Sequence, residues 1–193
     1  MRAQASVAAY GGAIGGILYG VAFVLLDNDI AAAILLMLGG LASTIILFHL
    51  ATTLFSVNEP VARWALVIGM IASALTLVHT GYDLAKRIHP PDTPGVLLGH
   101  PSAVDPRGLA TFGLAGLAYL TLATLMSRSN AYTKRVARLG QALGVIMIVI
   151  YFGRLIILDP ENIVVRIALA AGVIANTTFL LWLGRIWSTA RPS

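Results

Sequence analysis

The chain has 193 residues, of which 58% are apolar and only 11% are charged, and its formal net charge is +5. A soluble domain usually carries about 25% charged residues, so this composition disfavours water-soluble globular folds, disordered chains and nucleic-acid-binding proteins. The mean hydropathy of +0.86 instead predicts an all-α polytopic membrane protein. The absence of cysteine excludes disulfides, thiolate metal sites and cysteine nucleophiles.

Six apolar stretches are long enough to cross a bilayer, which requires roughly 20 apolar residues per helix. We expect the first to be a retained span, because no small-residue cleavage site follows it. The breaks carry turn and cap residues, as in Asp27-Asn28-Asp29 and Asn58-Glu59-Pro60. The expected spans, within a single domain, are 7–26, 30–55, 61–82, 108–126, 138–158 and 163–187, with an outer loop over 83–107.

The positive-inside rule orients these six spans. With the N-terminus inside, the inner side carries a charge of about +7 and the outer side about −2. We therefore expect both termini to be cytoplasmic, in a bacterial-type inner membrane. The basic pI follows from this topology and needs no nucleic-acid partner. The inner cations are Arg2, Arg63, Arg128, Lys134, Arg135, Arg138, Arg185 and Arg191, against the single acid Glu59.

Part of the sequence repeats at an offset of 103 positions. Residues 61–73 match the later stretch at about seven of thirteen positions, pairing Arg63 with Arg166 and Gly69 with Gly172. Apolar helices also resemble one another by composition alone, which is the competing explanation. A repeat unit of three helices would make the second copy inverted, as in many transporters and channels.

The polar residues expected near the bilayer centre are neutral. No acidic or basic side chain lies there, which argues against a carboxylate-driven proton or sodium carrier. Hydrogen bonding between packed helices is one interpretation, and the lining of a path for a small neutral solute or an ion is the other. The expected lining residues are Ser73, Thr76, Asn176 and Thr177, with Thr178, Ser43 and Thr44 at similar depth.

Glycines repeat at helical spacing in the first span. Gly12, Gly16 and Gly20 fall on one face, and Gly140 with Gly144 repeats the pattern later. Such faces let helix backbones approach closely. They predict packing within the bundle or, alternatively, a homodimer through the Gly12, Gly16 and Gly20 face.

The histidines are badly placed for a shared haem. His49 and His79 are expected at about 10 Å and about 27 Å from the inner face, so about 17 Å separates them along the membrane normal. Two adjacent helices therefore cannot present both to one iron. We expect no cofactor, and we interpret His49 as a helix-packing residue.

The outer end of the third span offers the strongest chemical cluster. His79 and Asp83, at i and i+4, share a helical face and could bind a metal ion or form a catalytic base with its carboxylate. The proline-rich loop that follows adds His89 and His100 as further metal ligands. The competing interpretation is an interfacial cap in which Asp83 pairs with Lys86 or Arg87 one turn later.

Two arginines mark the outer mouth with Asp83. Arg154 and Arg166 are expected near the outer boundary, where they either reach the headgroups or bind an anionic group of a substrate. The chain has no Gly-x-Ser-x-Gly, phosphate-binding glycine loop or His-Glu-x-x-His motif, which disfavours an enzyme.

Three functional hypotheses follow. The first is a permease or channel for a small solute or ion without carboxylate coupling. The second is a membrane-embedded metal-dependent enzyme or redox protein at the outer end of the third helix. The third is an accessory or scaffold subunit of a membrane complex.

Overall fold

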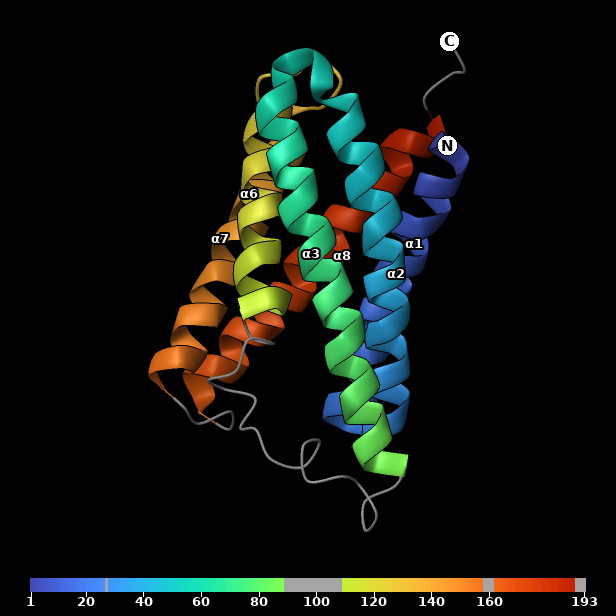
Figure 1. The fold of residues 1–193 in the computed structure, drawn as a ribbon, viewed down its shortest axis with the longest axis vertical. Coiled ribbons are helices and arrows are strands. Elements are labelled where there is room, and N and C mark those ends of the chain that lie inside the picture. The colour runs from blue at the N-terminus through green and yellow to red at the C-terminus, as the bar shows by residue number, and fades with distance from the viewer. Residues whose placement is uncertain (27, 89–108, 158–161, 190–193) are drawn as a thin grey trace.

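The computed structural model describes residues 1–26, 28–88, 109–157 and 162–189, and within these ranges it is helical without any strand (Figure 1). The expected break near 28–29 separates two helices, the one at 58–60 is a kink at Asn58 within one long helix, and the helix expected from 138 begins at Lys134. The elements are α1 (Arg2–Gly20), η1 (Val21–Leu25), α2 (Asp29–Thr53), α3 (Phe55–Ile88), η2 (Leu109–Leu114), α6 (Ala115–Met126), α7 (Lys134–Ile156) and α8 (Ile163–Thr189).

Side-chain caps begin three of these helices. The Oδ1 of Asn28 accepts a hydrogen bond from the Ala31 N–H at 3.0 Å, and the Thr133 hydroxyl accepts one from Val136 at 3.4 Å. Within α3, Asn58 has an extended backbone (φ −162°, ψ 94°) and accepts from the Val61 N–H at 3.2 Å. Asn58 is therefore an N-cap, and the long part of α3 begins after it.

The helices form a closed ring in chain order. Each packs against the next, from α1 through α2, α3, α6 and α7 to α8, and α8 returns to pack against α1. Because successive helices run in opposite directions, the N-terminus, the α2–α3 connection and the α6–α7 connection share the upper end in Figure 1. The ring thus brings the first helix, α1, into contact with the last helix, α8.

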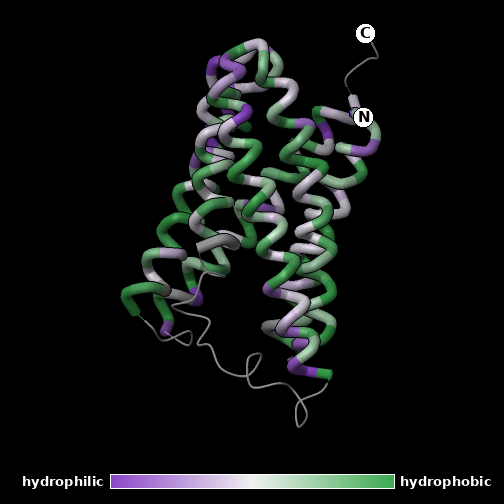
Figure 2. Tube along the Cα trace, in the orientation of Figure 1, coloured by the Kyte–Doolittle hydropathy of each residue, from purple (hydrophilic) through white to green (hydrophobic). Residues whose placement is uncertain are grey.

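Four helices are long and apolar enough to cross a membrane: Asp29–Thr53, Phe55–Ile88, Lys134–Gly153 and Arg166–Thr189. Thr111–Met126 forms a shorter apolar helix. Large apolar side chains are exposed along the bundle, including Val7 at 72% and Ile174 at 68%. Figure 2 shows hydrophobic residues distributed along the length of the helices. An apolar exterior of this extent is typical of a protein solvated by lipid.

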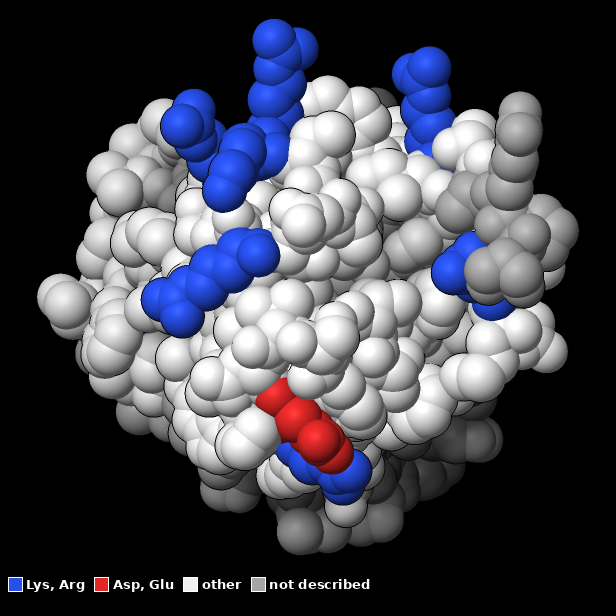
Figure 3. All heavy atoms as spheres, turned by 90° about the horizontal axis from the view of Figure 1, so that it is seen from above, with Lys and Arg blue, Asp and Glu red and all other residues white. Residues whose placement is uncertain are grey.

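Positive charge is concentrated on the upper end of the bundle. Viewed from above, that end carries well-separated Lys and Arg side chains (Figure 3). The acid there, Glu59, accepts a hydrogen bond from the Arg63 Nε at 2.8 Å. We call this end the positive end; at the opposite end, Arg87 forms an ion pair with Asp29 at 2.6 Å.

The main apolar core lies toward the positive end. Leu50, Leu54, Leu122, Phe179 and Leu183 are all fully buried there, contributed by α2, α6 and α8. Toward the other end, by contrast, α1 and α8 expose many of their side chains. The bundle is therefore sealed most tightly at the positive end.

Candidate functional site

Three of the polar residues on α3 share one buried face. Ser73, Thr76 and Thr80 are 5%, 9% and 1% exposed. The Thr76 hydroxyl donates to the Ala72 carbonyl at 2.9 Å and lies 3.5 Å from the hydroxyl of Thr111 on η2. Thr80 and Thr111 were not among the residues expected here, although the i+4 spacing from Thr76 was a signal for Thr80. On its side toward the later helices, α3 packs against η2 and α6.

The polar residues of α8 face α1 instead. A Cβ built on Gly16 would lie 3.5 Å from the Thr177 hydroxyl and 4.0 Å from the Asn176 side-chain nitrogen. Among the described residues, the Thr177 hydroxyl is buried with no hydrogen-bond partner. Thr178, one residue later, is exposed and donates to the Ile174 carbonyl at 2.8 Å. Only Thr177 of this pair therefore presents an unused buried hydroxyl.

The glycine face of the first span is used inside the bundle. A Cβ on Gly12 would lie 3.1 Å from Leu180 of α8 and 3.7 Å from Ile46 of α2, whereas Gly20 has no such neighbour within 4 Å. This is the first of the two interpretations given for these glycines. Gly12 and Gly16 act as close-contact positions between α1 and its neighbours.

The four expected lining residues thus belong to two interfaces. Thr76 lies on the α3 face toward η2, with the buried Ser73 on the same face of α3, and Asn176 and Thr177 lie where α8 meets α1. Each interface joins a helix of the first three to a helix of the last three. The residues are neutral at both places.

At the far end of α3, the expected His79 and Asp83 pair is formed. Nδ1 of His79 lies 3.4 Å from Oδ2 of Asp83, and the side chains are 17% and 42% exposed. Arg87, which the cap interpretation offered to Asp83, binds Asp29 instead. A carboxylate beside an imidazole nitrogen orients the ring and favours one tautomer.

The remaining parts of the expected metal site and outer mouth are only partly described. His89, His100 and the side chain of Arg154 lie outside the described residues, and Arg166 is an exposed residue near the start of α8. Across the described ranges, no three His, Asp or Glu side chains come together as a metal site. Of the expected metal ligands, the described structure brings together His79 and Asp83.

His49 lies at a different end of the bundle from His79. It is 7% exposed and packs edge-to-face on Trp187, with ring centroids 4.9 Å apart. It also lines a cavity of about 310 Å³ with Gln4, Thr44 and Phe48. The sequence pattern did not indicate this cavity, because its walls come from three different helices.

Comparison with known proteins does not add a relationship. No family model matches the chain, and no match was found among the curated proteins or the solved structures. The fold and the surface define an all-helical protein with several helices of membrane-spanning length.

Proposed function

We propose that the protein is a six-span membrane bundle of two inverted halves that lets a small uncharged solute pass along the interfaces between them. The halves are α1 to α3 and α6 to α8, with η1 and η2 completing the two shorter spans. The positive end faces the cytoplasm, in accordance with the positive-inside rule. The observation that carries the proposal is the presence of neutral polar side chains at both interfaces between the halves.

Equivalent contacts in the two halves support the repeat. The nearest atom to a Cβ on Gly69 would be Leu47 Cδ1 at 2.9 Å, and on Gly172 it would be Ile150 Cδ1 at 3.0 Å. Leu47 and Ile150 are separated by the same 103 positions as the two glycines. The offset was found in α3 and α8 alone, so its agreement in α2 and α7 is independent support.

Burial follows the same offset along α2 and α7. Three residues spaced seven apart are buried on α2, and the three residues 103 positions later are buried on α7. The pairs are Ala33 with Val136, Gly40 with Leu143, and Leu47 with Ile150. Because a helix has 3.6 residues per turn, a face that repeats every seven residues stays directed at the same neighbour.

The chemistry of the two interfaces favours an uncharged solute. Thr76 and Thr111 lie hydroxyl to hydroxyl between α3 and η2, and the Thr177 hydroxyl faces α1 without a partner among the described groups. A buried hydroxyl without a hydrogen bond costs about 1–3 kcal/mol. A hydrogen-bonding solute would recover that energy, whereas an ion would find no opposite charge there.

The positive end would act as the gate. Leu50, Leu54, Phe179 and Leu183 fill the bundle at that end, so a solute can pass only when these side chains separate. Hydrophobic constrictions of this kind exclude water and ions until they widen.

η2, which carries Thr111, consists of a π-helical turn beside α3. This rare geometry often occurs at functional sites.

The test is solute flux into proteoliposomes, followed by stopped-flow light scattering with urea and glycerol. The wild-type protein should raise the permeability above that of protein-free vesicles. Thr177→Val should lower the solute permeability about fivefold, because it removes one hydrogen bond worth about 1 kcal/mol. Thr178→Val is the matched control, because that hydroxyl is exposed and already bonded within its helix, and its flux should equal the wild-type value.

Two outcomes would contradict the proposal. One is a permeability no higher than that of empty vesicles for both solutes. The other is an equal effect of the Thr177 and Thr178 substitutions, which would show that the buried hydroxyl has no special part in the path.

A second candidate function rests on the His79 and Asp83 pair, whose geometry suits a metal ligand set or a catalytic base. Metal analysis and an absorption spectrum of the purified protein test it. A stoichiometric metal or pigment that is lost in His79→Ala would favour membrane-embedded chemistry over transport. A colourless, metal-free protein would remove the metal and pigment forms of this candidate.

A further inference from the structure

The cavity beside His49 opens on the side of the bundle rather than at its end. It has a volume of about 310 Å³ and lies between the first turn of α1, the second half of α2 and α3. Its apolar walls are outward-facing, since Ile45, Phe48 and Met70 are 45%, 41% and 38% exposed. In a membrane, these walls would contact lipid chains.

Three of the side chains that line this mostly apolar side pocket are polar: Gln4, Thr44 and His49. His49 lines it and is more than nine-tenths buried, and its Nε2 has no hydrogen-bond partner among the described residues. Gln4 contributes an amide from α1. A buried ring nitrogen without a partner costs about 1–3 kcal/mol, so a polar ligand group that reached Nε2 would recover that free energy.

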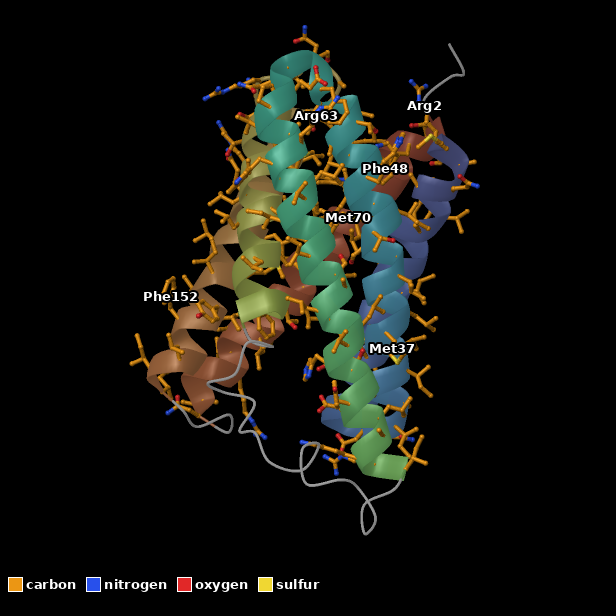
Figure 4. All side chains as sticks on the ribbon, viewed as in Figure 1. Arg2, Met37, Phe48, Arg63, Met70 and Phe152 are labelled. Atoms are coloured by element: carbon orange, nitrogen blue, oxygen red, sulfur yellow. The ribbon has the colours of Figure 1, made fainter. Side chains whose placement is uncertain are left out.

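The charge around the pocket is positive. The Arg2 guanidinium lies close enough to act electrostatically on His49, and Figure 4 shows Arg2 at the top of α1, beside and above Phe48. The acid of the positive end, Glu59, is occupied by Arg63. An anionic group at the mouth of the pocket would therefore meet attraction from Arg2.

We propose that this side pocket binds an anionic phospholipid, with the phosphate near Arg2, Gln4 and His49 and an acyl chain along Ile45, Phe48 and Met70. The juxtaposition of a cation, a buried imidazole and lipid-facing apolar walls matches the two parts of such a molecule. The volume is at the lower end of the range for ligand pockets, about 300–1,000 Å³, so it holds one headgroup and the adjoining part of a chain. The assignment does not depend on the transport function.

Lipid binding is measured by native mass spectrometry of the detergent-purified protein, titrated with phosphatidylglycerol and phosphatidylcholine of identical acyl chains. The wild-type protein should bind its first phosphatidylglycerol more tightly than phosphatidylcholine. Arg2→Gln should weaken phosphatidylglycerol binding about fivefold, since one basic residue near an anionic surface contributes about 1 kcal/mol. Phe48→Ala should weaken both lipids, because it removes a wall of the acyl-chain half.

The matched control is Arg128→Gln, which removes one exposed cation from the same end of the bundle at a position outside the pocket. Its lipid affinities should equal the wild-type values. His49→Gln, which keeps a polar side chain, provides a second variant and should alter phosphatidylglycerol binding more than phosphatidylcholine binding.

Three results would overturn the assignment. The first is equal affinity of the wild-type protein for the two lipids. The second is an equal loss in Arg2→Gln and Arg128→Gln, which would assign the preference to diffuse charge. The third is displacement of the bound lipid by millimolar inorganic phosphate, which would make the site one for a soluble anion.

Discussion

The substitution Gly144→Ala tests the packing of the bundle most directly. A Cβ at this position would lie 2.6 Å from the Leu120 backbone nitrogen, 2.7 Å from the Leu120 Cβ and 2.8 Å from the Gly116 carbonyl oxygen. Non-bonded carbon atoms prefer separations of about 3.5–4.0 Å. Because the opposing atoms include backbone, no side-chain rotation relieves the overlap, and α6 and α7 must move apart.

The expected cost combines two opposing terms. Overpacking of a tight contact costs about 1–3 kcal/mol, and the rigid opposing backbone places Gly144→Ala at the upper end of that range. Replacing a helical glycine by alanine returns about 0.5–1 kcal/mol. The net loss in the free energy of unfolding should be about 2 kcal/mol, which corresponds to a fall in Tm of about 4–8 °C for a chain of this size.

The assay is thermal unfolding of the purified protein in a mild detergent, with Gly153→Ala as the control on the same helix. A Cβ on Gly153 would meet nothing within 4 Å, so this variant should be as stable as the wild-type protein or slightly more stable. A Gly144→Ala protein with unchanged Tm would refute the close α6–α7 contact. Equal losses in both variants would show that glycine matters at these positions for reasons other than packing.

Two further predictions concern the repeat and the positive end. Gly69→Ala and Gly172→Ala should each lower the free energy of unfolding by about 1 kcal/mol. This loss is smaller than for Gly144→Ala because the nearest atoms are the movable side-chain ends of Leu47 and Ile150. Clearly unequal losses of the two variants in thermal unfolding would count against equivalent positions. Tyr132, in the α6–α7 connection, lies 2.8 Å from the Thr53 hydroxyl and accepts a hydrogen bond from Trp187 Nε1 at 3.4 Å. Burial raises the pKa of the Tyr132 hydroxyl, so its stabilising contribution is present below the unfolded-state pKa of about 10 and is lost as the pH rises through the raised folded-state pKa. Tyr132→Phe should weaken this alkaline decline above about pH 10, and an unchanged pH profile would contradict it.

Much of the helical framework was predictable from local chemistry. Of the polar residues at the expected breaks, Asn28 caps α2, and Asn58 forms a kink in α3 and caps the long part that follows. The i and i+4 spacing of His79 and Asp83 was enough to predict their contact. The charges at the positive end were also predictable, because they occupy the connections between apolar stretches and the end turns of the helices.

The helix bounds were less predictable where no polar residue forces a break. α3 continues to Ile88, beyond the expected Tyr82, and α7 begins at Lys134 rather than 138. Charged residues such as Lys86 and Arg135 are good helix formers, so a helix can extend past the apolar stretch that first reveals it. Hydropathy therefore marked the apolar part of each helix and left its ends undefined.

The sequence by itself determined the helical class, the breaks and the clustering of charge, because caps, apolar length and charge placement act locally. Only the tertiary structure decided which helix faces meet. Gly16 opposes Thr177 because the ring closes α8 onto α1, and His49 lies in a side pocket with Gln4 because α1 packs against α2. The physical reason is that lipid is as apolar as the protein core, so membrane helices carry no clear hydrophobic stripe to indicate their buried side.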